Sequence, residues 1–114
     1  MTNKLVVAMT TCANQGEAER LARLLVEQRL VACAMIGQQV RSIYPWDGRI
    51  EITEEAPLTV KTMPAKIPAL KRAIEKAHPY SVPELLIFAD IDCLKPYAEW
   101  VRDWVSEPAS ETAD

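Results

Sequence analysis

Histidine, glycine and basic charge are scarce in this 114-residue chain, which has one histidine and three glycines. Thirteen Lys and Arg stand against sixteen Asp and Glu, so the net charge is −3. That balance argues against a protein held mainly by nucleic-acid phosphates, because such domains usually carry a basic surface. So few glycines leave no glycine-rich phosphate loop, and neither a nucleophile elbow nor an HExxH motif occurs. The residues therefore give no support for catalysis, and we expect a protein that is not an enzyme.

Long apolar runs are missing as well. The longest, such as residues 31–36, hold about six residues, whereas a helix that spans a bilayer needs ~20. The apolar run before Thr10 is shorter than the roughly 7–15 residues of a secretory signal. The three cysteines are widely spaced and form no CxxC pair, which argues against a disulfide framework and a zinc knuckle. We therefore expect a reduced, cytoplasmic protein without membrane insertion.

Hydrophobic periodicity predicts the order βαββαβ followed by a C-terminal helix. Two right-handed crossovers around a hairpin give an α+β fold, a ferredoxin-like antiparallel sheet of four strands with helices on one face. This single domain covers residues 1–105, and residues 106–114 form a polar, acidic tail that we expect to be mobile. The expected strands are residues 5–9, 31–44, 50–61 and 85–89. The expected helices follow Gly16 as far as residue 29 or 30, follow residues 63–64 until residues 78–79 end the helix, and run from about residue 94 to residue 105.

The central hairpin has several sequence signals. Residues 45–48, Pro-Trp-Asp-Gly, are typical of a turn. A change in the parity of apolar positions suggests a bulge near Gly37. After the turn, apolar residues hold the even positions from Ile50 to Val60, which favours one long strand with one wet face. Glu54 breaks this alternation, and Pro57 implies a stretch without a ladder partner.

The hairpin also points to self-association. The thirteen residues 31–43 would extend about 40 Å at ~3.3 Å each, whereas a compact domain of this length is about 34 Å across. The first, second and fourth strands do not alternate apolar and polar residues, so something must cover the second face of the sheet. We therefore expect an oligomer, with Trp46 and Tyr44 at the hairpin tip as subunit contacts.

Five short motifs occur in a fixed order over about residues 4–105 and resemble the CutA divalent-cation tolerance family. The most specific is the His-Pro-Tyr-x-x-Pro-Glu string that follows an upstream Tyr-x-Trp-x-Gly. The resemblance implies a ferredoxin-like subunit in a tight, PII-like trimer, with a link to copper and other divalent cations. The motifs are Leu30-Val31-Ala32-Cys33-Ala34, Tyr44-Pro45-Trp46-Asp47-Gly48-Arg49-Ile50-Glu51, Lys61-Thr62, His78-Pro79-Tyr80-Ser81-Val82-Pro83-Glu84-Leu85 and Tyr97-Ala98-Glu99-Trp100.

The resemblance also implies copper ligands, a cysteine at the end of the first strand and histidines before the Pro-Tyr. In this chain Thr10 holds that cysteine position, Cys12 lies two residues on, and the histidine pair is reduced to Ala77-His78. Cys12 and His78 are therefore the candidate metal ligands. Cys12 lies in the loop after the first strand and is expected to be the exposed thiol, whereas Cys33 lies in an apolar run and is expected to serve packing.

A second candidate site is a polar corner formed by Lys61, His78, Tyr80 and Glu84. Such a set could hold an anionic or zwitterionic small molecule, or it could form a buried polar network. The residues leave both interpretations open.

The leading hypothesis is a cytoplasmic, non-enzymatic homotrimer that is associated with divalent-metal (copper) tolerance. It would require no cofactor, and copper or another divalent cation would bind weakly. The alternative is a PII-like regulatory module that binds a small anionic ligand at the clefts between subunits, and a ferredoxin-like enzyme ranks third. The expected partners are further copies of the chain and an unknown small ligand or metal ion.

Overall fold

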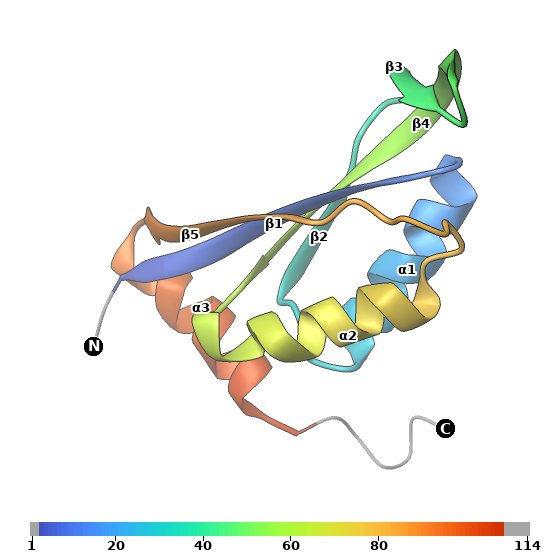
Figure 1. Cartoon of the computed structure of the whole chain (residues 1–114). Coiled ribbons are helices and arrows are strands. Elements are labelled where there is room, and N and C mark those ends of the chain that lie inside the picture. Colours follow the sequence, from blue (N-terminus) through green and yellow to red (C-terminus); the bar gives the residue numbers. More distant parts are fainter. Residues whose placement is uncertain (1–2, 109–114) are drawn as a thin grey trace.

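The computed structural model describes residues 3–108, which form a layered α+β subunit (Figure 1). The sheet order is β2-β4-β1-β5, all pairs are antiparallel, and β3 pairs with the far half of β4. This arrangement confirms the predicted ferredoxin-like βαββαβ fold with a C-terminal helix. The elements are β1 (Lys4–Cys12), α1 (Gln15–Glu27), β2 (Cys33–Ile36), β3 (Val40–Trp46), β4 (Arg49–Thr62), the 3₁₀ turn η1 (Pro64–Lys66), α2 (Ile67–Ala77), β5 (Leu86–Asp92) and α3 (Lys95–Ser106).

The two crossover helices cover one face of the sheet. Even-numbered residues of β1 and β4, such as Ala8, Leu58 and Val60, point to this face and pack with Leu21 of α1 and Leu70 of α2 in the main core. All five are at most 3% exposed. The alternation of apolar and polar residues along β4 predicted one buried face, and this prediction is confirmed for the half of the strand that lies over the helices.

Helix α3 packs on part of the opposite face. Leu5 and Met63 join Val101 of α3 in a second, smaller core cluster. The guanidinium carbon of Arg29 lies 3.5 Å from the centroid of the Trp104 ring, which fixes α3 against the end of α1. The rest of this face stays open. Its exposed apolar side chains are Met9, Met35, Leu86 and Phe88.

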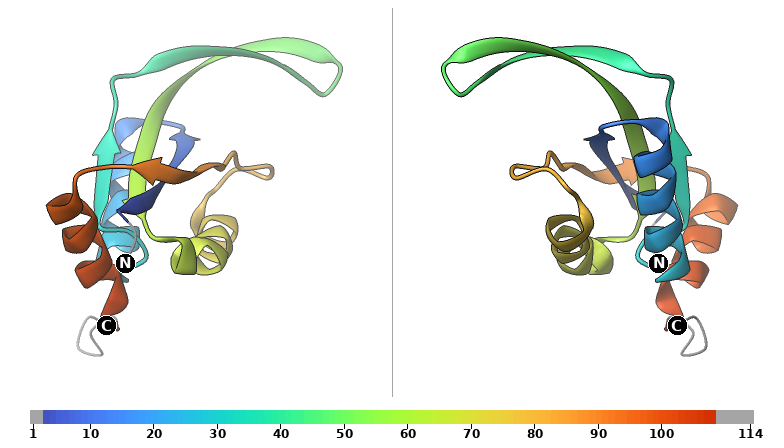
Figure 2. Two further views of the ribbon diagram at one scale, coloured as in Figure 1. Left: turned by 90° about the vertical axis from the view of Figure 1, so that its left-hand side faces the viewer. Right: turned by 90° about the vertical axis from the view of Figure 1, so that its right-hand side faces the viewer.

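The hairpin of β3 and β4 extends beyond the body of the subunit (Figure 2). The longest axis is 48 Å and the radius of gyration is 15.0 Å, larger than the ~13 Å of a compact domain of this length. In place of the expected bulge, the strand breaks at residues 37–39 between β2 and β3. The Gly37 amide donates to the Pro57 carbonyl oxygen at 2.9 Å, so the missing N–H of Pro57 faces this break.

The hairpin turn is tighter than the sequence suggested. Asp47 and Gly48 both have positive φ, 52° and 80°, which is the pattern of a two-residue type I′ turn. Pro45 is not a turn residue but lies in β3, opposite Ile50. The type I′ turn is favoured because its twist matches that of the strands it joins.

The C-terminal helix runs through Ser106, one residue beyond the predicted domain end. Residues 109–114 of the predicted tail lie outside the described residues. Between residues 3 and 108, the structure contains no helix long and apolar enough to cross a membrane.

Candidate functional site

A cleft of about 610 Å³ lies where the overhanging hairpin leaves the body of the subunit. One wall comes from the end of β1 and the loop after α2, and the other comes from β3 and β4. The cleft contains aromatic rings, hydroxyl groups and carboxylates. Its lining residues are Thr11, Ala13, Ser42, Ile43, Tyr44, Trp46, Thr53, Glu54, Glu55, Tyr80, Ser81, Val82 and Glu84.

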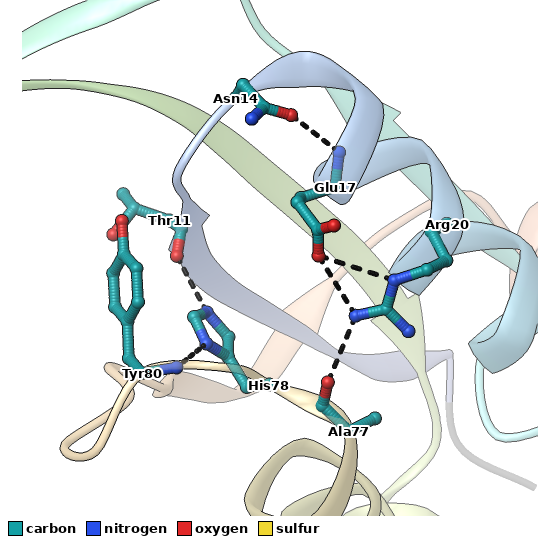
Figure 3. Close-up of polar contacts among 7 residues, drawn as sticks. All are labelled: Thr11, Asn14, Glu17, Arg20, Ala77, His78 and Tyr80. Atoms are coloured by element: carbon teal, nitrogen blue, oxygen red, sulfur yellow. Dashed lines mark hydrogen bonds and ion pairs between the residues drawn. The ribbon is translucent and has the colours of Figure 1, made fainter.

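His78 caps α2 and fixes the loop that carries Tyr80 (Figure 3). Its Nε2 lies 2.8 Å from the Thr11 carbonyl oxygen, and its Nδ1 accepts the Tyr80 backbone N–H at 3.2 Å. Because a carbonyl oxygen only accepts, this pattern requires the proton on Nε2 and the lone pair on Nδ1. Both ring nitrogens are therefore in use, and the side chain is only 5% exposed.

Glu55 is a central carboxylate of the site that sequence reasoning missed. It is 8% exposed, and its Oε2 accepts the Tyr80 hydroxyl at 2.9 Å and the Thr11 hydroxyl at 3.1 Å. Burial of Tyr80, followed by its hydrogen bond to Glu55, raises the pKa of the Tyr80 hydroxyl. The signal was the pair Glu54-Glu55, because two adjacent strand residues point to opposite faces and cannot share one wet face.

The structure brings three of the four predicted polar residues to this corner and places the fourth elsewhere. The Thr11 hydroxyl lies 3.4 Å from Glu84 Oε1, so Glu84 joins the same polar group as Tyr80. Lys61 does not join it. It lies six residues from Glu55 along β4, about 20 Å at ~3.3 Å per residue, and its Nζ donates to Met35 Sδ at 3.2 Å. The expectation of a lysine in this corner is wrong because Lys61 lies on the half of β4 that pairs with β2.

Cys12 is buried rather than exposed. It is the last residue of β1, and only 2% of its surface is accessible because it packs in the main core with both crossover helices. Burial, followed by the charge of Glu17, raises the pKa of the thiol. The prediction of an exposed thiol is wrong because β1 runs through Cys12, three residues beyond the expected strand end.

A short chain of polar contacts holds this corner closed (Figure 3). Asn14 caps α1 by accepting the Glu17 amide at 2.8 Å. Glu17 pairs with Arg20 at 3.1 Å, and Arg20 Nη2 donates to the Ala77 carbonyl oxygen at 3.1 Å. The start of α1 is thereby tied to the end of α2, where a cation also suits the helix dipole.

Tyr44 and Trp46 lie on the cleft face of the hairpin. The Tyr44 hydroxyl accepts a hydrogen bond from Thr53 at 3.2 Å, whereas Trp46 is half-exposed at the tip. Their role as subunit contacts stays a prediction.

The donor set does not fit a tight copper site within one subunit. Copper ions bind to thiolates and to imidazole nitrogens with a free lone pair. Cys12 is buried, and both nitrogens of His78 are in use. Across residues 3–108 no three His, Cys, Asp or Glu side chains are grouped so that they could hold a metal ion.

Comparisons with known proteins agree with the fold. Residues 6–104 match the sequence model of the family described as CutA1 divalent ion tolerance protein. The chain is similar to human Protein CutA, with 38% identity over 105 residues that cover 92% of this chain and 58% of that protein. It is also similar to the Divalent-cation tolerance protein CutA of Thermus thermophilus, with 35% identity over 85% of this chain and 94% of that protein.

A solved structure extends this similarity to three dimensions. The crystal structure of CutA1 from Shewanella sp. SIB1 superimposes with a TM-score of 0.84 and 38% identity, covering 91% of this chain and 97% of that chain. This chain therefore spans nearly all of the bacterial proteins but less than two thirds of the human relative.

Proposed function

The chain belongs to the CutA1 divalent ion tolerance protein family, and on that basis we propose that it is a non-enzymatic homotrimer that acts in the tolerance of divalent metal ions. The observation that carries the proposal is the exposed apolar surface of the overhanging hairpin. The three cysteines of the chain are free thiols, which suits the reducing cytoplasm that we propose as the location of the protein.

The outer face of the hairpin is an apolar ladder that nothing among residues 3–108 covers. Ile43 lies opposite Ile52, and Pro45 lies opposite Ile50. The three isoleucines are 60–67% exposed, although such side chains are usually inside. Contiguous exposed apolar surface of this kind marks an interaction site, and we propose that a second copy of the chain covers it.

The open part of the sheet gives a second surface for association. Met35, Met9 and Leu86 belong to one row across the sheet, in which Thr59 of β4 lies between Met35 of β2 and Met9 of β1, and Leu86 of β5 pairs with Met9. All three are more than a third exposed. A sheet with both faces apolar needs cover on both, and closed symmetry lets identical copies provide it.

Copper enters this proposal only as a weakly bound ion. Thiolate is the ligand that Cu⁺ prefers, but the Cys12 thiol is buried and its raised pKa keeps it protonated. We propose that copper reaches Cys12 only when the corner around His78 opens. Divalent-cation tolerance would then not depend on a tight site within one subunit.

The cleft supports a second candidate function, a PII-like regulatory module that binds a small ligand. The sequence suggested an anionic ligand, and Lys61 was the cation meant to receive it. With Lys61 outside the cleft and three glutamates in its lining, an anion loses its counter-charge. The lining of the cleft therefore does not favour the anionic ligand that the sequence suggested.

Growth under metal stress tests the leading function. Bacterial cells that lack their own member of the family would receive this chain, and their growth would be followed as Cu²⁺ is raised. We expect the wild-type chain to restore growth, and Trp46→Ala to restore it less because it weakens assembly. A chain that accumulates as a trimer and restores nothing would contradict a role in metal tolerance.

A further inference from the structure

We propose that the cleft binds a small organic cation, a protonated amine or quaternary ammonium group attached to an apolar body. This inference rests on the second candidate function, ligand binding by the cleft, and reverses the charge of the ligand expected there. It does not depend on metal binding.

Among residues 3–108, the carboxylate of Glu55 is buried without a cation beside it. Glu55 is more than nine-tenths buried, and ionised side chains are seldom buried so deeply unless they are paired. Both of its hydrogen-bond donors, the side chains of Tyr80 and Thr11, are neutral hydroxyl groups. The ion pairs Arg20–Glu17 and Arg23–Glu19 lie on the surface of α1 and do not involve Glu55. A cation from outside the subunit would complete the site.

The other oxygen of this carboxylate, Oε1, accepts no hydrogen bond from Tyr80 or Thr11. Tyr80 and Thr11 both donate to Oε2 of Glu55, and neither donates to Oε1. In the described part of the chain, the one buried side-chain polar atom without a hydrogen-bond partner is Thr10 Oγ1. Oε1 is therefore not sealed in the protein, and it is free to accept from a donor in the cleft.

The charged side chains around the cleft are negative. Glu55 and Glu84 meet at the Thr11 hydroxyl in this cleft, and its lining contains no Lys, Arg or His among the described residues. Carboxylates gathered at a concave surface attract cations and repel anions. The cleft thus selects positive charge before any contact is made.

Three aromatic rings line the cleft. Tyr44, Trp46 and Tyr80 face the same cleft, and aromatic faces attract ammonium groups by cation–π interaction. Val82 adds apolar surface for the body of a ligand. A volume of about 610 Å³ is in the range of small-molecule sites, roughly 300–1,000 Å³.

A bare metal ion fits this lining less well. Hard divalent cations take about six to eight oxygen ligands, and the closest carboxylates here, Glu55 and Glu84, meet at one threonine hydroxyl. Aromatic rings do not supply the missing ligands. The combination of a few carboxylates with three rings is typical of organic-ammonium sites.

Three probes with one phenylethyl body test the charge directly: phenethylammonium, 2-phenylethanol and 3-phenylpropionate. Binding would be measured by calorimetry and by the NMR shift of the Trp46 indole N–H, with the native mass taken on the same samples. We expect phenethylammonium to bind and to shift Trp46, and the neutral and anionic probes to bind at least about tenfold more weakly.

Variants assign the effect to Glu55. Glu55→Gln keeps an acceptor for Tyr80 and Thr11 but removes the charge, so phenethylammonium should bind about tenfold more weakly or worse. Glu75→Gln, on the exposed face of α2, should leave the binding of phenethylammonium unchanged.

Four outcomes would overturn the inference: equal binding of the three probes, unchanged binding to Glu55→Gln, loss of the native mass in Glu55→Gln, or Cu²⁺ binding that depends on Glu55 without amine binding. The third would show that a neighbouring copy supplies the cation. A trimer that binds no amine would defeat this inference and leave the proposed trimer intact.

Discussion

The Nε2 atom of His78 lies 2.8 Å from the carbonyl oxygen of Thr11, and this contact ties the end of α2 to the end of β1. The same ring accepts the backbone N–H of Tyr80 and so sets the loop that forms one wall of the cleft. His78 therefore serves the site by position, and the groups that face the cleft are Tyr80, Glu55 and Glu84.

Removal of the His78 ring should destabilise the fold. His78→Ala leaves the Thr11 carbonyl and the Tyr80 amide without partners, and each buried unpaired group costs about 1–3 kcal/mol. We expect the free energy of unfolding to fall by about 2–4 kcal/mol in denaturant titrations at fixed protein concentration. Lys76→Ala, two residues before His78 and exposed, is the control. A His78→Ala protein as stable as wild type would contradict a structural role.

The buried thiol of Cys12 should make stability fall at high pH. Because burial raises its pKa in the folded state, the unfolded chain loses this proton first as the pH rises through 9.0, the ordinary value. The unfolded state then binds fewer protons, so stability decreases with pH by at most about 1.4 kcal/mol per unit. Cys12→Ala should lose less stability between pH 9 and pH 10 than wild type does. An unchanged slope, with Cys33→Ala as the matched control, would mean that Cys12 ionises equally in both states.

Copper(I) binding should be weak and should depend on Cys12. In a competition titration, Cys12→Ser should reduce binding, and Cys33→Ser should leave it unchanged. Mild denaturant should strengthen binding by wild type, because opening of the corner exposes the buried thiol. Tight binding to the intact fold would contradict a buried ligand, and loss of binding in Cys33→Ser alone would show that Cys33 is the copper ligand. If neither variant changes binding, the link to copper in this protein is indirect.

The hairpin turn should depend on Gly48 through backbone conformation alone. A Cβ at Gly48 would meet nothing within 4 Å, but its φ is +80°. Gly48→Ala should therefore destabilise the protein by about 1–2 kcal/mol in thermal or denaturant unfolding. Gly37→Ala is the matched control, because its Cβ would make only ordinary contact with Pro57 at 3.5 Å. Equal effects of the two substitutions would contradict the type I′ turn.

The parts of the fold that could be predicted are those in which burial follows the local period. Leu58 and Val60 alternate with polar neighbours, and they are buried against α1 and α2 as expected. Ile50 and Ile52 continue the same pattern, yet they are 60–67% exposed. Periodicity shows that a face is apolar but does not show which molecule covers it, so the same signal gave a core position in one half of β4 and an uncovered surface in the other.

The candidate site was harder to predict because distant segments assemble it. Glu55 is buried by Tyr80, which lies 25 residues further along the chain, and by Thr11, 44 residues before it. No local pattern encodes those contacts. Lys61 and Glu84 both belong to family-like motifs, but only the strand register shows that Lys61 lies opposite Cys33 of β2 and not at the cleft. Cys12 was misplaced for a smaller reason, a strand end set three residues too early.

Native mass measured by light scattering at micromolar concentration tests the proposed trimer most directly. We expect a mass of three times the 12.8 kDa chain, because the hairpin ladder and the open sheet face need partners of the same kind. Trp46→Ala should shift the mass downwards on dilution, since loss of a central aromatic contact often costs about 2 kcal/mol or more. Trp100→Ala, which removes a half-exposed ring stacked on Tyr97, should keep the mass of wild type. A stable, folded 12.8 kDa monomer under these conditions would contradict the trimer.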